Sequence, residues 1–370
     1  MTEYDVAVSG GGPAGSALAA YLARRGRRVL LVERGSPGRG RVCGGFLGPE
    51  IFPLLEMIGM AGAEPPSASL DRLVLSHGRT GVFERRLPGR GLGVERSRFD
   101  AWLFGRARLA GADVREEATL DASSAGGARV LRIVPVSGAP EEVRARFLVR
   151  AHGRRAVRAS GRPPFFGCKS VYRNVRGLDG AVALHFVRRA NVGFNSLGEG
   201  RTALCLYADG AHLRAAHGDL DGMVRSFARE NPWIARQLEG AERAGDWTSC
   251  QAEPDGREIF YEEGSFHVGD AVAMMHPLVG GGITLAMSSA VVLGRLLAGA
   301  PGGEPDAEIA RRYRRGWKRA FGRPIRWGNA LGFLQGSDGL TASALGWMKR
   351  NRALLELVVR RSRPRPGGGP

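Results

Sequence analysis

The first 33 residues carry apolar runs that predict a strand, a helix and a second strand. Residues 4–9 (YDVAVS) are typical of a short buried strand. Residues 13–25 (PAGSALAAYLARR) predict a helix, and residues 28–33 (RVLLVE) predict a strand that ends on an acid. A strand–helix–strand opening of this kind predicts an α/β fold with a parallel sheet.

The hydrophobic pattern shortens after this opening and predicts a β-rich middle. Residues 49–60 suit a short helix, and residues 97–110 suit an amphipathic helix with Phe99, Trp102, Leu103 and Leu109 as its apolar positions. Alternating or short apolar runs predict strands at residues 70–87, at 114–117 and in two runs within 128–151 joined by a turn at 137–140. Four further strands are predicted at residues 170–175, 181–187, 192–197 and 202–207, and these four are expected to form an antiparallel sheet.

The remainder of the chain is predicted to be mostly helical. Residues 220–238 read as a helix interrupted at Pro232, and residues 265–268 as a strand that ends at Gly269-Asp270. Helix then continues beyond Gly281, apart from a linker at 300–306. We therefore expect four regions: a discontinuous nucleotide domain (1–70, 95–165 and 255–300), an inserted β-rich substrate domain (71–94 and 166–254), a helical C-terminal region (305–362) and a disordered tail (363–370).

The turn between the first strand and the first helix has the glycine spacing of a dinucleotide-binding site. Gly10, Gly12 and Gly15 follow G-x-G-x-x-G. Gly10 permits the tight turn, Gly12 lets the backbone approach a pyrophosphate, and Gly15 lets helix and strand pack closely. The helix start, with Pro13 and Ala14, offers free N–H groups to the phosphates. Glu33 and its neighbour Arg34 lie where a carboxylate would bind the ribose hydroxyls.

A second glycine-rich segment, GDAVAMMHPLVGGGITLAMSSA (269–290), indicates the other end of a nucleotide site. Asp270 ends a strand and is placed to accept hydrogen bonds from a polyol chain. A loop through Pro277 then leads to a helix start that brings bare N–H groups near a ligand, at Gly280, Gly281, Gly282 and Ile283. Such a helix end stabilises negative charge on a reduced flavin.

Composition narrows the class of protein. A hydrophobic content of 43% and a charged content of 24% fit a globular protein. The net charge of +18 comes almost entirely from arginine, since the chain has only three lysines, and no basic stripe or motif predicts nucleic-acid binding. The four cysteines are scattered and predict neither a disulfide framework nor a metal site. No signal peptide and no uninterrupted membrane-spanning apolar run is recognised, so we expect a cytoplasmic protein.

The two glycine motifs together resemble the FAD-binding fold of the aromatic hydroxylase (group A flavoprotein monooxygenase) and geranylgeranyl reductase superfamily, and the resemblance covers nearly the whole chain. It implies a Rossmann-like FAD-binding domain of the GR2 type, with an inserted antiparallel substrate sheet and a helical C-terminal part. FAD rather than NAD would occupy the fingerprint, with Glu33 at the adenosine ribose and Asp270 at the ribitol. NADPH or NADH is the reductant that the resemblance implies.

Three further segments take roles from this resemblance. RSRFDAWL (96–103) is similar to the family's arginine-bearing helix, which implies that Arg98 reaches FAD. RVCGGFLGPE (41–50) is similar to the R-x-C-G-G segment of the reductase branch, so Arg41, Cys43 and Gly44 would approach the flavin, with Cys43 also a candidate catalytic residue. His152-Gly153 replaces the family's usual Asp-Gly, which puts reduction by NAD(P)H in question.

The reaction remains open at this level. The segment 185–209 resembles bacterial flavoproteins of polyketide and phenolic-lipid pathways, which favours a monooxygenase acting on an apolar aromatic or polyketide-like molecule. Alternatives are a flavin ene reductase that saturates isoprenoid or lipid double bonds, and a non-catalytic FAD-binding protein. A halogenase is disfavoured because a W-x-W-x-I-P segment is missing.

Candidate chemistry follows from two places in the sequence. His276 in the flavin-facing loop is the best candidate acid or base, because imidazole titrates near neutral pH. Phe186, Val192, Phe194, Leu204 and Leu206 would supply a sheet face over the flavin, with His185, Phe194 and Asn195 in the substrate pocket. Residues 347–361 carry an apolar stripe between basic residues, which suits either packing on the body or contact with an anionic membrane; the positive charge would also suit an acidic carrier protein.

Overall fold

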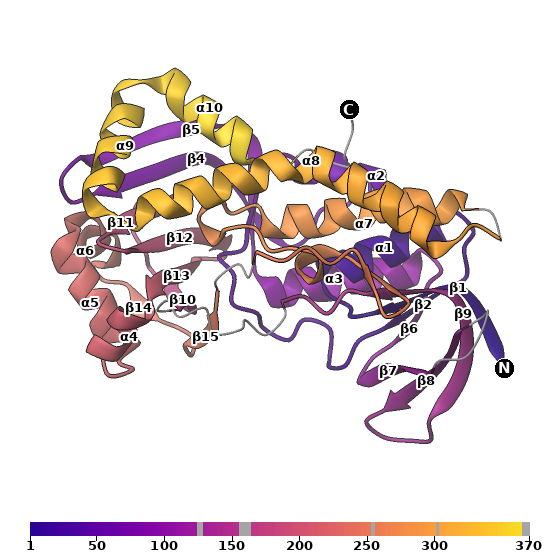
Figure 1. Cartoon of the computed structure of the whole chain (residues 1–370). Helices are drawn as coiled ribbons and strands as arrows, with labels where there is room; N and C mark the ends of the chain where they lie inside the picture. The colour runs from indigo at the N-terminus through magenta and orange to yellow at the C-terminus, as the bar shows by residue number, and fades with distance from the viewer. Residues whose placement is uncertain (124–128, 155–163, 253–255, 301–302, 365–370) are drawn as a thin grey trace.

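The computed structural model describes residues 1–123, 129–154, 164–252, 256–300 and 303–364. Two sheets organise these residues, and they lie side by side in Figure 1 with helices around them. The predicted linker and tail fall partly outside the described residues, at 301–302 and 365–370. The mixed α/β class expected from the sequence is confirmed.

The first sheet contains the N-terminal strand at its centre. Strand β1 (Thr2–Ser9) is parallel to β2 (Val29–Val32) on one side and to β9 (Glu141–Arg150) on the other. β2 pairs in parallel with β6 (Asp113–Arg115), and β9 with β17 (Ser265–His267). The sheet is completed by three further strands: β7 (Ala118–Ser123) and β8 (Arg129–Pro135), which extend β9 as a meander, and the edge strand β16 (Tyr261–Glu262).

The two faces of β1 are buried against different partners, as the period of two in a strand requires. Val6 and Val8 face the helices α1 (Pro13–Ala23), α3 (Arg96–Leu109) and α7 (Gly282–Gly299). Ala7 faces the other way, toward apolar residues of β8 and β9. Close approach of α7 to α1 depends on Gly294, where a Cβ would lie 2.7 Å from the Tyr21 ring. The part of the strand that is buried on both faces, Val6–Val8, is therefore apolar throughout, which is the pattern seen in the sequence.

The amphipathic helix was predicted at the right place but with one wrong apolar position. Leu109 is 76% exposed, whereas Phe104 is buried with Phe99 and Leu103. Residues 99, 103 and 107 lie on one helical face, and 104 extends it, while 109 falls on the opposite side.

The second sheet is built mainly from the middle of the chain. Its central order is β10 (Phe165–Arg173), β13 (Arg201–Asp209), β12 (Ala190–Gly198) and β11 (Ala181–Val187), all antiparallel as predicted. β11 continues, in parallel, onto the long hairpin β4 (Ser67–His77) and β5 (Gly81–Val94). Three short strands pair at its margins: β3 (Phe46–Leu47), β14 (Glu242–Arg243) and β15 (Thr248–Gln251). The domain boundaries drawn from the sequence remain a prediction.

Helices cover the second sheet on both faces. One face packs against α4 (Gly210–Ala215), α5 (Leu220–Glu230) and α6 (Pro232–Leu238), the last two separated at Pro232 as expected. On the other face, α9 (Asp338–Arg350) and α10 (Arg352–Ser362) contact the β4–β5 hairpin and β11. The 30-residue helix α8 (Asp306–Gln335) runs along the molecule beside α7 and reaches α9 (Figure 1). The remaining helices are α2 (Ile51–Met57) and the one-turn segments η1 (Gly269–Ala271) and η2 (Pro277–Val279).

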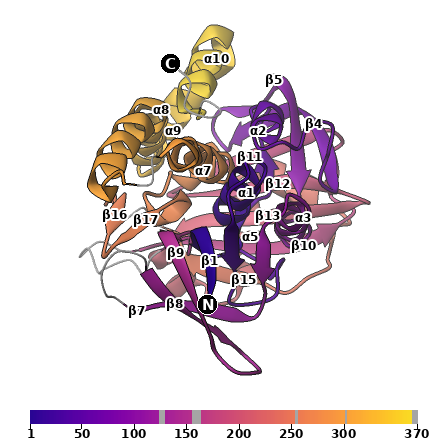
Figure 2. The same cartoon turned by 90° about the vertical axis from the view of Figure 1, so that its right-hand side faces the viewer.

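Helix α7 is also the element of the described chain that is long and apolar enough to span a membrane. Most of its residues are buried, and it contacts α1, α2 and α8. Figure 2 shows α7 next to α1 within the body of the molecule. Its apolar character is accounted for by its packing against α1, α2 and α8 inside the protein.

Candidate FAD and substrate site

The dinucleotide fingerprint lies at the carboxyl edge of the first sheet, where open α/β sheets bind nucleotides. Gly10 has φ of +110°, and a Cβ there would lie 2.5 Å from the Ala151 carbonyl oxygen. At Gly15 a Cβ would lie 1.9 Å from the Gly10 carbonyl oxygen. At Gly12, by contrast, a Cβ would meet no atom within 4 Å. Gly10 and Gly15 are thus required by the protein itself, whereas Gly12 borders open space.

Glu33 follows β2 and reaches across to the fingerprint loop. Its Oε2 accepts a hydrogen bond of 2.6 Å from the Gly11 N–H, and its Oε1 accepts one of 3.2 Å from the Gly35 N–H. Arg34, the next residue, is exposed. The carboxylate is therefore fixed beside the start of α1, where the adenosine ribose of a dinucleotide is expected.

The second glycine motif is brought directly against the first. β17 lies beside β9, and Gly269 packs so closely on α1 that a Cβ would lie 2.9 Å from the Ala14 Cβ. Gly269 and Gly280 have positive φ values of +67° and +61°, conformations that favour glycine. Segments some 250 residues apart thus meet at one edge of the sheet.

Two helix N-termini point their free N–H groups into this region. Neither α1 nor α7 has a side-chain cap or an acidic residue in its first turn. A Cβ at Gly282, as at Gly12, would meet no atom within 4 Å. Two uncapped helix starts with open space in front of them fit the anionic and electron-rich parts of FAD. The site would hold the pyrophosphate at α1 and the flavin ring at α7.

Asp270 lies between two arginines of this site. Burial raises the pKa of its carboxyl group, while Arg154 and Arg96 act in the opposite direction. Arg154 is held by the Gln251 carbonyl oxygen at 3.0 Å and the Cys250 Sγ at 2.9 Å. Asp270 is thus an acceptor at the edge of the sheet, as a ribitol-binding residue must be.

The arginine next to Asp270 is Arg96, not the predicted Arg98. Arg98 has a side chain 46% exposed and pairs with Glu95 and Glu199 at the surface. Arg96 makes a two-bond ion pair with Asp100, at 2.9 Å and 2.7 Å, and both side chains are buried. The i, i+4 spacing of Arg96 and Asp100, in phase with the buried Phe99, is the sequence signal that would have identified it. Arg154 was missed as well, since nothing in the sequence indicates its proximity to Asp270.

The Cys43 loop lies between Arg96 and the second sheet. The Cys43 Sγ accepts a hydrogen bond of 3.3 Å from the Gly45 N–H, and the sulfur contacts the Arg96 guanidinium. Burial alone would lower the pKa of Arg96, but Asp100 and then Cys43 raise it. Arg41, at the start of the loop, is exposed. Cys43 is thus partly exposed and lies beside the Arg96–Asp100 ion pair.

One face of the second sheet, which we call the inner face, closes over this loop. Asn195 donates from Nδ2 to the Gly44 carbonyl oxygen at 2.8 Å. A Cβ on Gly44 would lie 3.9 Å from the Cys205 Sγ, and one on Gly167 would lie 3.3 Å from Val42. The inner face therefore carries Asn195 and Cys205 toward the predicted flavin position.

Two of the three predicted substrate residues lie on the opposite face. His185 is bound by Ser76 at 2.6 Å and Gln237 at 2.7 Å, and its ring packs edge-on to Phe194. His185 and Phe194 belong to the core beneath α5 and α6, so their predicted place in the substrate pocket was wrong. Val192, Leu204 and Leu206, which were predicted to face the flavin, belong to the same core. Side chains alternate between faces along a strand, so Phe194 and its neighbour Asn195 cannot share one.

His276 is placed near the predicted flavin but is held as a neutral ring. Its Nδ1 accepts from the Leu278 N–H at 3.3 Å, which leaves the proton on Nε2 to donate to the Tyr207 oxygen at 3.2 Å. Burial lowers its pKa to about 4. Helix α8 packs against the ring, because a Cβ on Gly332 would lie 2.3 Å from Nε2. These contacts suit a positioning residue, and its role in catalysis stays a prediction.

His152 lies at the end of β9, next to the fingerprint turn. Its Nε2 is 2.8 Å from the Ser9 Oγ. Burial lowers its pKa, and the charges of Arg150 and Arg34 lower it further. These effects disfavour the charged form of the ring, which makes its hydrogen bond to Ser9 where the resemblance led us to expect a carboxylate.

A buried apolar cluster, which we call the apolar wall, adjoins the site. Leu75, Phe83 and Phe186 from the second sheet pack with residues of α9 and α10, and the cluster takes in Leu278 from the second glycine motif. Leu184, Trp327 and Leu331 lie at its margin. The apolar wall thus begins beside the loop where the flavin is expected and is roofed by the C-terminal helices.

Comparison with known proteins agrees with this geometry. A family model described as an FAD-binding domain matches residues 3–176, and one described as squalene epoxidase matches residues 255–315. The chain is 27% identical over 351 residues to digeranylgeranylglycerophospholipid reductase 2 of Methanopyrus kandleri, covering 88% of this chain and 85% of that protein.

Solved structures show the same fold. The flavin-dependent brominase Bmp2 superposes with a TM-score of 0.83 at 18% identity, covering 99% of this chain and 94% of that one. A geranylgeranyl bacteriochlorophyll reductase-like protein of Thermoplasma acidophilum gives 0.79 at 19% identity, covering 98% and 97%. The chain is thus similar to geranylgeranyl reductases along most of its length and carries an FAD-binding domain over residues 3–176. It is an FAD-dependent oxidoreductase.

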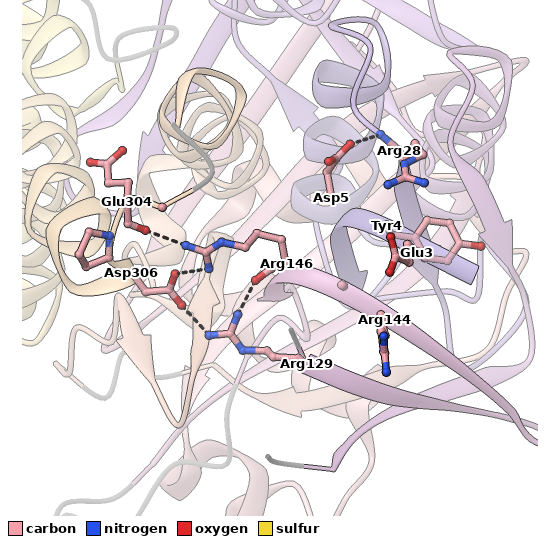
Figure 3. A pocket seen from close by; sticks show the side chains of 12 residues that line it. Glu3, Tyr4, Asp5, Arg28, Arg129, Arg144, Arg146, Glu304 and Asp306 are labelled. Carbon is pink, nitrogen blue, oxygen red and sulfur yellow. Dashed lines mark hydrogen bonds and ion pairs between the residues drawn. The ribbon is translucent and has the colours of Figure 1, made fainter. Parts of the chain in front are cut away.

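A separate recess of about 600 Å³ lies at the opposite end of the first sheet from this flavoprotein's cofactor edge. Figure 3 shows Arg129 and Arg146 pointing to Asp306 at the start of α8. The recess is lined by four arginines and by four carboxylates, so these charges balance: Arg28, Arg129, Arg144 and Arg146, with Glu3, Asp5, Glu304 and Asp306. We read the recess as an ion-pair network that fixes α8 to β8 and β9. Within the described ranges, no group of three or more His, Cys, Asp or Glu is placed to hold a metal.

Proposed function

We propose that this flavoprotein is a monooxygenase that acts on an apolar, aromatic or polyketide-like small molecule, with NADPH or NADH as reductant. The observation that carries the proposal is the apolar wall: the buried cluster that contains Phe186 and Leu75 extends to the partly buried Leu278, which leads to the proposed flavin-binding helix start. An apolar substrate bound there would lie next to the flavin and away from water. The squalene epoxidase match over 255–315 supports oxygen chemistry, since that enzyme is named for epoxidation of an apolar polyene.

The residues have separable tasks in this proposal. Bound FAD would supply the electron transfer. Gly12 and the α1 start would bind its phosphates, Asp270 its ribitol and Arg96 the region between them. The neutral His276–Tyr207 pair would shape the pocket without supplying charge. The roofing helices α8–α10 would keep water from the reduced cofactor.

A second candidate is a flavin ene reductase. It is favoured by the similarity to digeranylgeranylglycerophospholipid reductase along most of the chain and by the Cys43 thiol beside Arg96. The same apolar wall would hold a polyprenyl chain. The two candidates differ in whether an oxygen atom or two hydrogens are added to the substrate.

One experiment separates them. The purified FAD-loaded protein is incubated with squalene, geranylgeraniol or a long-chain alkylresorcinol, either with NAD(P)H under ¹⁸O₂ or anaerobically with dithionite. A product carrying one labelled oxygen is expected. Anaerobic gain of two hydrogens would support the reductase instead. If neither product forms with any of these substrates, so that the FAD-loaded protein is no more active than protein stripped of FAD, both candidates are wrong.

A further inference from the structure

Lys169 is a buried lysine that the proposed reaction has not yet used. It is one of only three lysines in the chain and lies on β10 with 8% of its surface exposed. The strand register places it directly opposite Cys205 on β13 and Thr248 on β15. Because directly opposed residues share a face, Lys169 lies on the inner face with Cys205, the face that closes over the Cys43–Gly44 loop.

No anionic partner is assigned to this lysine within the described residues. Its ammonium group makes no hydrogen bond or ion pair there, whereas Lys318 pairs with Glu258 and Lys349 bonds the Thr80 carbonyl. Lys169 acts on Glu95 only through its charge, and that carboxylate is already bound by Arg201. Burial raises the pKa of the Cys205 thiol to about 12 despite the opposing effect of Lys169, so this neighbour is neutral. An ammonium group without a counter-ion, on a side chain this largely buried, favours uptake of an anion.

The same face holds two further groups with unused hydrogen-bonding capacity. Asn191 and Asn195 are both buried, and the Asn191 Nδ2 and the Asn195 Oδ1 have no partner. Asn191 is directly opposite Tyr207 on β13, the residue that contacts His276. One end of the inner face, at β10–β12, thus carries cationic and amide groups. The other end, at β11, β4 and β5, carries the apolar wall.

We propose that Lys169 binds an anionic oxygen of the substrate, a phenolate, enolate or carboxylate, while the apolar body of the substrate lies against the partly buried margin of the wall, at Leu184 and Leu278. The proposal rests on the proposed substrate site and narrows its ligand class to amphipathic acids. A plain hydrocarbon would leave the Lys169 charge buried and unpaired, so it would bind less well. Asn191 would donate a hydrogen bond to a neighbouring oxygen of the same ligand.

The test uses binding to the oxidised, FAD-loaded protein, so it is independent of turnover. Benzoate, 2-naphthoate and 9-anthroate are each titrated against their neutral amides while the flavin absorbance is followed. We expect at least one carboxylate to bind about tenfold or more tightly than its amide, the discrimination typical of a hydrogen bond to a charged group. Lys169→Met should abolish this preference, and Lys169→Arg should retain part of it. Lys318→Met, which removes an exposed lysine, should leave it unchanged.

Two results would overturn the proposal. One is that carboxylates and amides bind alike, or that none binds, in the unmodified protein. The other is that Lys169→Met releases FAD, which would assign the lysine to the cofactor phosphates. If oxygen transfer fails but the carboxylate preference is lost in Lys169→Met, the proposed reaction is wrong and the anion site stands.

Discussion

His185 illustrates how a polar residue can be fully used for structure inside an apolar core. The ring is 1% exposed, and Ser76 and Gln237 satisfy both of its nitrogens. Ser76 is in turn bound by Asn231, whose amide also donates to the Phe186 carbonyl at 3.1 Å. With Nε2–H donating to Gln237 and Nδ1 accepting from Ser76, every group is paired only while the ring is neutral.

This network predicts an acid-dependent loss of stability. Burial lowers the pKa of His185 from 6.5 to about 4, although the bond to Gln237 acts the other way. Because the folded pKa lies below the unfolded one, the stabilisation is complete above pH 6.5 and is lost as the pH falls toward 4. The contribution is about 3 kcal/mol. Urea unfolding of the protein and of His185→Gln is measured at pH 7.5, 5.5 and 4.5. Between pH 7.5 and 4.5 the free energy of unfolding should fall more in the unmodified protein than in the variant. An equal fall in both proteins would contradict the prediction.

At the scale of elements, the junction between β1 and α1 combines two kinds of glycine. Gly15 is packed against the Gly10 carbonyl oxygen, whereas Gly12 faces open space before the helix start. The same motif therefore contains one residue that the fold needs and one that only a ligand would need.

Replacement by alanine is therefore predicted to have opposite effects at Gly15 and at Gly12. Gly15→Ala should lower stability by about 2 kcal/mol or more, because the Cβ would force β1 and α1 apart. Gly12→Ala should leave apoprotein stability within about 0.5 kcal/mol but weaken FAD binding about tenfold or more. Thermal unfolding of the apoproteins and fluorescence titration with FAD measure both. An equal loss of FAD affinity and stability in Gly12→Ala would show that this residue, too, is needed by the fold.

At the scale of the whole molecule, the C-terminal helices divide their apolar residues between two surroundings. Leu345, Met348, Leu355 and Val358 pack on the second sheet, as ordinary amphipathic helices do. Phe333, Leu340 and Trp347 remain exposed, the last at 69%. They lie on α8 and α9, close in sequence to the basic residues Lys349, Arg350 and Arg352. Exposed aromatic and basic groups together are typical of a membrane-contacting surface.

We therefore expect salt-sensitive binding to anionic vesicles. The protein should co-sediment with vesicles of phosphatidylglycerol and phosphatidylcholine at low salt more than with phosphatidylcholine alone. Trp347→Ser should reduce the bound fraction severalfold. Leu109→Ser, which removes an equally exposed leucine from α3, is the matched control and should have no effect. Equal binding by both variants and by neutral vesicles would exclude this surface.

The sequence alone determined the parts of the protein that depend on local spacing. Gly10, Gly12, Gly15 and Glu33 lie within one strand–helix–strand unit, so the spacing along the chain fixes their arrangement. The pairing of this unit with Gly269-Asp270 predicted an FAD site, and the comparisons confirm an FAD-binding domain. The order of most helices and strands also followed, since apolar periodicity is a local property.

Only the tertiary structure decided which side chains face the site. Arg96 and Arg98 are equally plausible in the sequence, but the helix buries one beside Asp270 and exposes the other. A strand apolar on both faces gives no signal of which face meets the flavin, so His185 and Phe194 were assigned to the wrong one. Lys169, Asn195 and Cys205 lie on three different strands and share one face only when the sheet forms, and Asn195 and Cys205 then meet the Cys43 loop. The cofactor was therefore determined by spacing along the chain, while the substrate pocket was determined by which sheet face packs on which layer.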